Sequence, residues 1–212
     1  MVRVLVVDDD AMVRSFLRQI LTKRGNDVVA EASDGDEVVP AVQAHHPDVV
    51  LMDLRMERMD GVRATAAVAA LPDPPGVVAM TSFDTESTIL DAVYAGAAGF
   101  LAKDAGPDEL VAAVEAVASG DGALSPRAAR VVMEQVAAAP TARGRREAQG
   151  MLAQLTDRER EIAYCVAEGL SNIEIAGRLH LGEATVKTHL GHACHKLGVN
   201  RVRLALLVDR AS

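Results

Sequence analysis

The sequence predicts a doubly wound α/β domain with a five-stranded parallel sheet of order 2-1-3-4-5, followed by a small all-α domain. Over residues 1–120, short apolar runs alternate with helical segments, and such runs are typical of parallel strands buried on both faces. After this region the pattern is helical only. The charge also divides, because residues 1–120 carry 9 Lys and Arg against 20 Asp and Glu, whereas residues 151–212 carry 8 against 7. Two domains with different partners are therefore expected.

Each element of the first domain has a local signal. The apolar runs predict strands at residues 2–7, 28–32, 48–53, 77–81 and 98–102. The segments between them predict helices at residues 12–24, 36–45, 61–71, 86–95 and 107–119. Gly25, Gly96 and Gly120 follow three of these helices and favour the left-handed backbone that closes a helix. Pro107 suits a first helical turn.

The rest of the chain is divided into a linker over residues 121–147 and a second domain over residues 148–212. The linker is expected to contain a helix from Arg127 to Ala139, followed by a polar, mobile stretch over residues 140–146. In the second domain, Thr156 and Glu159 form a capping box that begins a helix. Further short helices follow, of which Glu183 to Leu197 is the longest.

Composition excludes several classes of protein. The 212 residues carry a net charge of −8, and no apolar run approaches the roughly 20 residues of a membrane span. The chain starts directly with a strand pattern, which leaves no room for a signal peptide. Cys165 and Cys194 do not suggest a disulfide framework. We therefore expect a soluble cytoplasmic protein, and the aromatic content of 2% argues against a large pocket for an apolar ligand.

Four predicted strands end in a chemically active residue, namely at Asp8-Asp9, Asp53, Thr81 and Lys103. In an open parallel sheet these ends lie at one edge, where ligands bind. Neighbouring carboxylates repel one another, so such a cluster persists mainly when a cation neutralises it. Mg²⁺ prefers oxygen ligands.

The expected magnesium site has defined roles for each group. Asp9 and Asp53 are expected to be direct ligands, with Asp8 acting through water and the backbone carbonyl of Arg55 as a further ligand. Asp53 is also a plausible nucleophile, since carboxylates form acyl-phosphates. Lys103 would pair with phosphoryl oxygens and Thr81 would donate a hydrogen bond to them, so that catalysis would be mostly positioning and charge neutralisation.

This pattern, with the segment from Asp53 to Gly61 and the run from Phe100 to Lys103, resembles the receiver domain of bacterial response regulators over residues 1–120. The resemblance implies that a sensor histidine kinase phosphorylates Asp53 and that Thr81 and Phe100 move to report it. Two departures are visible: Glu57 stands where most receivers have Pro, and Asp104 where many have Pro. Glu57 adds a negative side chain near the site and is expected to alter metal affinity or the dephosphorylation rate.

The helical run after residue 155 resembles the LuxR-type DNA-binding domain, with a helix-turn-helix from Ser171 to Leu190. With the receiver pattern it is identified as a member of the NarL/FixJ family. The resemblance implies that Thr185 to Leu197 lies in the major groove. The residues expected to contact DNA are Asn172, Thr185, Lys187, Thr188, His189, His192 and Lys196. Gly182 and Gly191 depart from the pattern. Because only Lys187 and Lys196 are cationic along this helix, moderate affinity helped by homodimerisation is expected.

The predicted function is a transcription regulator switched by phosphorylation of Asp53, with no catalysis beyond its own phosphoryl transfer and dephosphorylation. The main alternative is a receiver that is atypical and binds promoter DNA constitutively. A ligand-sensing LuxR regulator is disfavoured by the acid-Thr-Lys set and the scarce aromatics. A haloacid-dehalogenase-type phosphatase is disfavoured because Met12 stands where its motif wants Thr or Val and the chain is too short for a cap domain.

Overall fold

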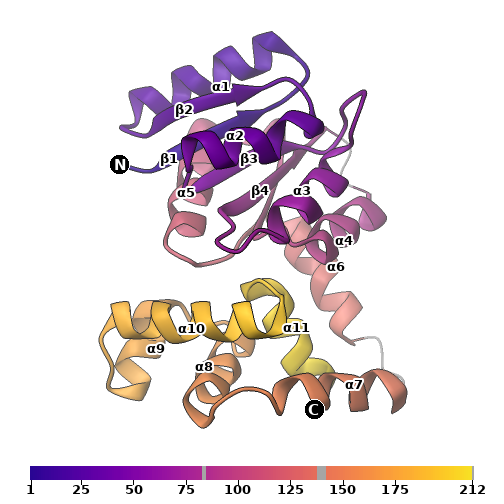
Figure 1. The fold of residues 1–212 in the computed structure, drawn as a ribbon, viewed down its shortest axis with the longest axis vertical. Coiled ribbons are helices and arrows are strands. Elements are labelled where there is room, and N and C mark those ends of the chain that lie inside the picture. The colour runs from indigo at the N-terminus through magenta and orange to yellow at the C-terminus, as the bar shows by residue number, and fades with distance from the viewer. Residues whose placement is uncertain (83–84, 138–141, 212) are drawn as a thin grey trace. The chain divides into compact units, whose positions relative to one another are not determined.

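The computed structural model describes residues 1–82, 85–137 and 142–211. Contacts divide the chain into two compact units, Met1–Val131 and Val132–Ser212. Each unit has its own buried apolar core, and each is described by itself. Figure 1 shows the parallel sheet of the first unit and the helices of the second.

The described residues of the first unit form a six-stranded parallel sheet of order β2-β1-β3-β4-β5-β6. Its strands are β1 (Arg3–Val7), β2 (Asp27–Ala32), β3 (Val49–Asp53), β4 (Gly76–Thr81), β5 (Gly99–Ala102) and β6 (Ala123–Leu124). The predicted order of the first five strands is confirmed. β6 lies in the predicted linker, and its two residues are too few to leave a strand pattern in the sequence.

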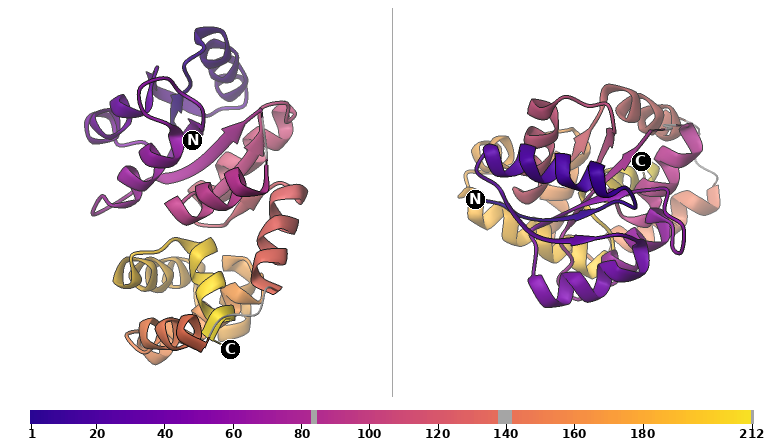
Figure 2. Two further views of the ribbon diagram at one scale, coloured as in Figure 1. Left: turned by 90° about the vertical axis from the view of Figure 1, so that its right-hand side faces the viewer. Right: turned by 90° about the horizontal axis from the view of Figure 1, so that it is seen from above.

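Helices cover both faces of this sheet. They are α1 (Ala11–Lys23), α2 (Val38–His45), α3 (Gly61–Ala69), α4 (Glu86–Ala95) and α5 (Pro107–Ala118), and the short 3-10 helix η1 (Gly35–Glu37) precedes α2. Successive side chains of a strand point to opposite faces. Val4 and Val6 accordingly pack in one cluster with residues of α1 and α5, whereas Leu5 and Val7 pack with residues of α2 and α3. The views in Figure 2 show this layering from two further directions.

The stretch predicted as a linker is largely helical. α6 (Pro126–Ala137) matches the expected helix closely, and α7 (Ala142–Leu152) occupies residues that were expected to be a polar, mobile stretch. That expectation is wrong from residue 142 onward, while residues 140–141 lie outside the described residues. α7 is stabilised by tertiary packing, because Ala148 and Leu152 are buried and the side chain of Gln149 donates to the carbonyl of Ala211 at 3.0 Å.

The second unit continues with α8 (Asp157–Ala167), α9 (Asn172–Leu179), α10 (Glu183–Leu197) and α11 (Arg201–Ala211). The capping box of Thr156 and Glu159 is confirmed, and Ser171 with Glu174 forms a second one at the start of α9. α10 begins at the predicted residue, with Gly182 as a cap that has no side chain to bond the helix. Within the described parts of the chain, no helix is both long enough and apolar enough to cross a membrane.

Candidate functional site

The strand register of the first unit explains how residues far apart in sequence meet. Val7 of β1 pairs with Met52 of β3, so Asp8 and Asp53 follow at neighbouring positions. One carboxylate oxygen from each of Asp8, Asp9 and Asp53 lies within 4.8 Å of the others. Asp8 and Asp53 are 1% and 3% exposed, whereas Asp9 is exposed. The predicted acidic cluster is therefore assembled at the carboxyl edge of the sheet.

Lys103 joins the two buried acids. Its position follows from the pairing of Thr81 with Ala102, which places residue 103 just beyond the end of β5. The backbone N–H of Lys103 donates to the carbonyl of Thr81 at 2.9 Å. Its ammonium Nζ lies 2.6 Å from Oδ2 of Asp8 and 2.9 Å from Oδ2 of Asp53. One cation is thus shared by two carboxylates.

Burial and this shared cation act in opposite directions on the titration of the site. Burial raises the pKa of Asp53 above its ordinary value, although the hydrogen bond from Lys103 opposes the change. Burial alone would lower the pKa of Lys103, but its hydrogen bonds to Asp8 and Asp53 outweigh that effect and raise the pKa. The ammonium therefore stays charged at neutral pH and balances part of the acidic cluster.

The cluster fits a hard divalent cation, because three carboxylate oxygens converge and the exposed Asp9 opens the group to solvent. The remaining predicted ligand, the carbonyl of Arg55, belongs to an exposed residue that follows Leu54 after the end of β3. Residues 8, 9 and 53 are the one group of three or more His, Cys, Asp or Glu side chains close enough to share an ion in the described portion of the chain.

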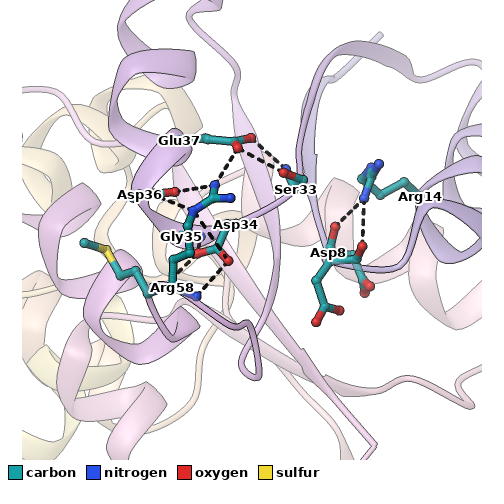
Figure 3. A network of polar contacts seen from close by, with 10 residues as sticks. Asp8, Arg14, Ser33, Asp34, Gly35, Asp36, Glu37 and Arg58 are labelled. Atoms are coloured by element: carbon teal, nitrogen blue, oxygen red, sulfur yellow. Dashed lines mark hydrogen bonds and ion pairs between the residues drawn. The ribbon is translucent and has the colours of Figure 1, made fainter.

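Arg14 of α1 was not predicted to belong to the site. Its guanidinium donates to the backbone carbonyls of Asp8 at 2.7 Å and Asp9 at 3.3 Å, as Figure 3 shows for Asp8. Glu31 of β2 accepts from the Nε of Arg14 at 3.3 Å. Arg14 therefore fixes the turn that carries the two acids. Its position five residues after Asp9 offers no recognisable spacing signal in a single sequence.

The turn after β2 also reaches the site region unexpectedly. The carboxylate of Asp34 accepts hydrogen bonds from the backbone of Arg58 and Met59, in the loop that follows Asp53 (Figure 3). The Asp34-Gly35 pair signals a turn in the sequence, but it does not reveal the partner loop some two dozen residues later.

Thr81 and Phe100 are both 1% exposed. Thr81 is the last residue of β4, beside the end of β5 that precedes Lys103. Phe100 lies in a buried cluster with Leu54 and with Ile89 of α4. The cluster also contains Ala128 and Val131 of α6. The structure therefore connects the residue after Asp53 with α4 and α6 through one apolar core.

In the second unit, α9 and α10 are joined by a tight turn at His180, whose backbone is left-handed with φ of 53°. Val186, Leu190, Ala193 and Leu197 are buried on the inner face of α10. The opposite face is exposed. Of the residues predicted to contact DNA, Thr185, Lys187, Thr188 and His192 are exposed there, and His189 is partly buried.

Two other residues predicted to contact DNA have partners inside the protein. Asn172 is 1% exposed, and its side-chain oxygen accepts from Arg201 at 2.8 Å. Lys196 donates to both carboxylate oxygens of Glu159, at 2.8 and 2.7 Å. These side chains hold α11 and α10 to the rest of the unit, and their contact with DNA stays a prediction.

Comparison with known proteins agrees with both units. Residues 4–115 match the family model for the response regulator receiver domain, and residues 153–208 match the model for bacterial regulatory proteins of the luxR family. The DNA-binding transcriptional activator DevR/DosR of Mycobacterium tuberculosis (strain ATCC 25618 / H37Rv) is 36% identical over 203 residues, covering 95% of this chain and 90% of the relative. The transcriptional regulatory protein LiaR of Bacillus subtilis (strain 168) is 35% identical over 214 residues, covering 99% and 98%.

A solved structure supports the same assignment over the whole length. The crystal structure of the response regulator ChrA in a heme-sensing two-component system is 40% identical, with a TM-score of 0.54, and the match covers 98% of this chain and 96% of that chain. The matches to LiaR and ChrA thus extend across both the receiver segment and the LuxR-type segment of this chain. The chain is a response regulator of the NarL/FixJ family, in which a receiver domain precedes a LuxR-type DNA-binding domain.

Proposed function

We propose that a sensor histidine kinase phosphorylates Asp53 and that this modification controls promoter binding by the second unit. The observation that carries the proposal is the placement of the Asp53 carboxylate, buried at the end of β3 beside Asp8 and Asp9 and 2.9 Å from the ammonium of Lys103. A buried nucleophile with a fixed cation beside it is suited to accept a phosphoryl group, whose charge the cation then balances.

The transfer places distinct demands on the residues of this chain. A carboxylate oxygen of Asp53 attacks the phosphorus, and a P–O bond forms as the P–N bond to the kinase histidine breaks and the nitrogen keeps the electron pair. Lys103 turns from the free carboxylate to the new phosphoryl oxygens, and the Thr81 hydroxyl donates to one of them. Asp9, Asp53, Asp8 and the Arg55 carbonyl would hold Mg²⁺, which when bound neutralises the anionic oxygens.

The DNA-binding surface that we propose is the exposed face of α10, with Thr185, Lys187, Thr188 and His192 directed to the major groove. Lys187 is 44% exposed and its ion pair with Glu183 is 3.4 Å long, so a phosphate can compete for it. With few cations on this helix, we propose that the active form is a homodimer on promoter DNA. We also propose that the protein acts in the cytoplasm and catalyses no reaction beyond its own phosphorylation and dephosphorylation.

A binding experiment tests the switch. The affinity of the full chain for a labelled fragment of its own upstream region is measured by fluorescence anisotropy with and without beryllofluoride and Mg²⁺, for the wild type and for Asp53→Asn. We expect beryllofluoride to raise the affinity of the wild type about tenfold, as for a typical allosteric coupling, and to leave the variant unchanged. Equal affinity in all four samples would instead support constitutive binding by an atypical receiver.

A further inference from the structure

The loop between β3 and α3 starts and ends against Asp53. The N–H of Gly61 donates to the carbonyl of Leu54 at 3.1 Å, which closes the base of the loop. A methyl group on Gly61 would lie 2.0 Å from the backbone oxygen of Asp53, so only glycine permits this approach. The segment from Arg55 to Asp60 therefore leaves the phosphorylation site and returns to it.

The far end of this loop is held by Asp34, which is 2% exposed and lies in the turn after β2. Its Oδ2 accepts from the N–H of Arg58 at 2.9 Å, and its Oδ1 accepts from the N–H of Met59 at 2.8 Å. These bonds to an ionised acceptor are stronger than neutral ones. The next residue, Gly35, allows direct backbone contact, because a methyl group there would lie 2.4 Å from the carbonyl oxygen of Met59.

The side chain of Arg58 forms a second set of contacts with the same turn, shown in Figure 3. We call the contacts of Asp34 and Arg58 together the clasp. Its guanidinium donates to both oxygens of Asp36, at 2.9 and 2.7 Å, and to Glu37 at 2.6 Å. Glu37 is itself held by the backbone N–H of Ser33 at 2.8 Å. Exposed ion pairs are individually weak, but a bidentate pair within a network fixes geometry.

Only Arg55, Met56 and Glu57 lie between the fixed base of the loop and its fixed far end. Three residues that connect two fixed points have little conformational freedom, so the position of Arg58 restricts the backbone of Arg55. The backbone N–H of Glu57 has no acceptor among the residues that the structure describes. The backbone N–H of Arg55 donates to the carboxylate of Asp53, so the segment is held at its near end by Asp53 and at its far end by Asp34.

We propose that Asp34, with Arg58 as an outer clasp, is a positioning residue of the phosphorylation site, which fixes the Arg55 carbonyl beside Asp53 and thereby sets the affinity for the divalent cation. The inference rests on the proposed function, because the Arg55 carbonyl has this role only if the acidic cluster binds the cation. Asp34 touches neither the cation nor the phosphoryl group, and it acts through the backbone of the loop.

The test compares the full-length wild type with Asp34→Asn and Arg58→Gln. Arg24→Gln is the matched control, since Arg24 is 51% exposed and pairs with Asp108 of α5, whereas Arg58 is 52% exposed. Amide hydrogen exchange of Arg58 and Met59 is followed by NMR without metal, and Mg²⁺ affinity is measured by titration calorimetry. We expect Asp34→Asn to speed exchange of both amides and to weaken Mg²⁺ binding about tenfold. Arg58→Gln should weaken it about threefold, and the control should match the wild type.

A second substitution keeps the test independent of stability. Glu57→Pro removes an N–H that has no acceptor in the described structure and restricts the loop backbone. Combined with Arg58→Gln, it should restore most of the Mg²⁺ affinity, a rescue that a merely structural role for the clasp does not predict. If Asp34→Asn does not fold, Arg58→Gln and its rescue decide the question.

The outcomes separate the inference from the proposed function. Fast exchange at Arg58 and Met59 with unchanged Mg²⁺ affinity would overturn the positioning role while leaving the acidic cluster as the site. A wild type that neither binds Mg²⁺ nor accepts a phosphoryl group from acetyl phosphate would overturn the proposed function, and the inference with it. Weaker Mg²⁺ binding in both clasp variants, with rescue by Glu57→Pro, would support it.

Discussion

Substitution of Glu159 by Gln should destabilise the DNA-binding unit, although the change is isosteric. The Glu159 side chain is 4% exposed, and its two oxygens accept from the ammonium of Lys196 at 2.8 and 2.7 Å. One oxygen also accepts from the backbone N–H of Thr156 at 2.9 Å, as part of the capping box. A glutamine would keep one acceptor and turn an NH₂ group toward the ammonium. The substitution therefore weakens the charged link between the start of α8 and the last turn of α10.

The size of the effect follows from the titration of Glu159. The hydrogen bond from Lys196 lowers the pKa of Glu159 from its ordinary value of 4.5 to about 2. Such a shift corresponds to a difference of about 3 kcal/mol in folding free energy between the ionised and the protonated form of Glu159. Lys196 is 41% exposed, so solvent screening reduces the contribution, and we expect a loss of about 1–2 kcal/mol. Because the pKa is lower in the folded state, this stabilisation is complete above pH 4.5 and disappears as the pH falls toward 2.

Urea unfolding of the full chain measures this loss. It is followed by circular dichroism and by tyrosine fluorescence in a Tyr94→Phe background, in which Tyr164 of α8 is the remaining tyrosine. Glu174→Gln is the matched control, because Glu174 completes the second capping box through its contacts with Ser171 but is exposed and forms no ion pair with a lysine among the described residues. The control should lose less stability than Glu159→Gln at neutral pH. Equal losses in the two variants, or a difference between Glu159→Gln and the wild type that does not shrink on acidification, would refute the reasoning.

Three further predictions concern the phosphorylation site and the DNA surface. Lys103→Met leaves Asp8 and Asp53 without their shared cation, so Mg²⁺ should raise the melting temperature of the variant more than that of the wild type, and equal shifts by calorimetry would contradict this. Gly61→Ala places a methyl group 2.0 Å from the Asp53 oxygen and should destabilise the receiver by about 3 kcal/mol in urea unfolding, with slower phosphorylation by acetyl phosphate. Lys187→Ala should weaken promoter binding and make the negative slope of log affinity against log salt shallower by about 1, because one phosphate contact is lost. An unchanged slope would place Lys187 away from phosphates.

The acidic site was predictable from sequence because its geometry is set by the sheet. Buried parallel strands leave apolar runs, and the residue at the end of each run lies at the same edge, which is why the sequence alone places Asp53 and Lys103 there. The clasp of Arg58 was not predictable, since its partners lie more than twenty residues away on a turn with no fixed spacing to the loop. Pairing of this kind depends on tertiary packing.

The second unit shows the same limit. The capping box of Thr156 and Glu159 is a local signal and was predicted, whereas the ion pair between Lys196 and Glu159 was not. Only the fold brings Lys196 to a buried carboxylate on another helix. α7 was missed for a related reason: its sequence is polar, and the helix is stabilised by burying Ala148 and Leu152 rather than by its own periodicity.

The structure also indicates how a change at Asp53 reaches the rest of the chain. Phe100 and Leu54, the residue after Asp53, share a buried cluster with Ala128 and Val131 of α6. The backbone is tied as well, because the N–H of Ser125 donates to the carbonyl of Phe100 at 3.1 Å. α6 contributes two residues to this cluster, and the residues of α6 after Val131 belong to the second unit. Since interiors are close-packed, we expect a movement of Phe100 to repack the first turns of α6, which would couple α6 to the phosphorylation that we propose.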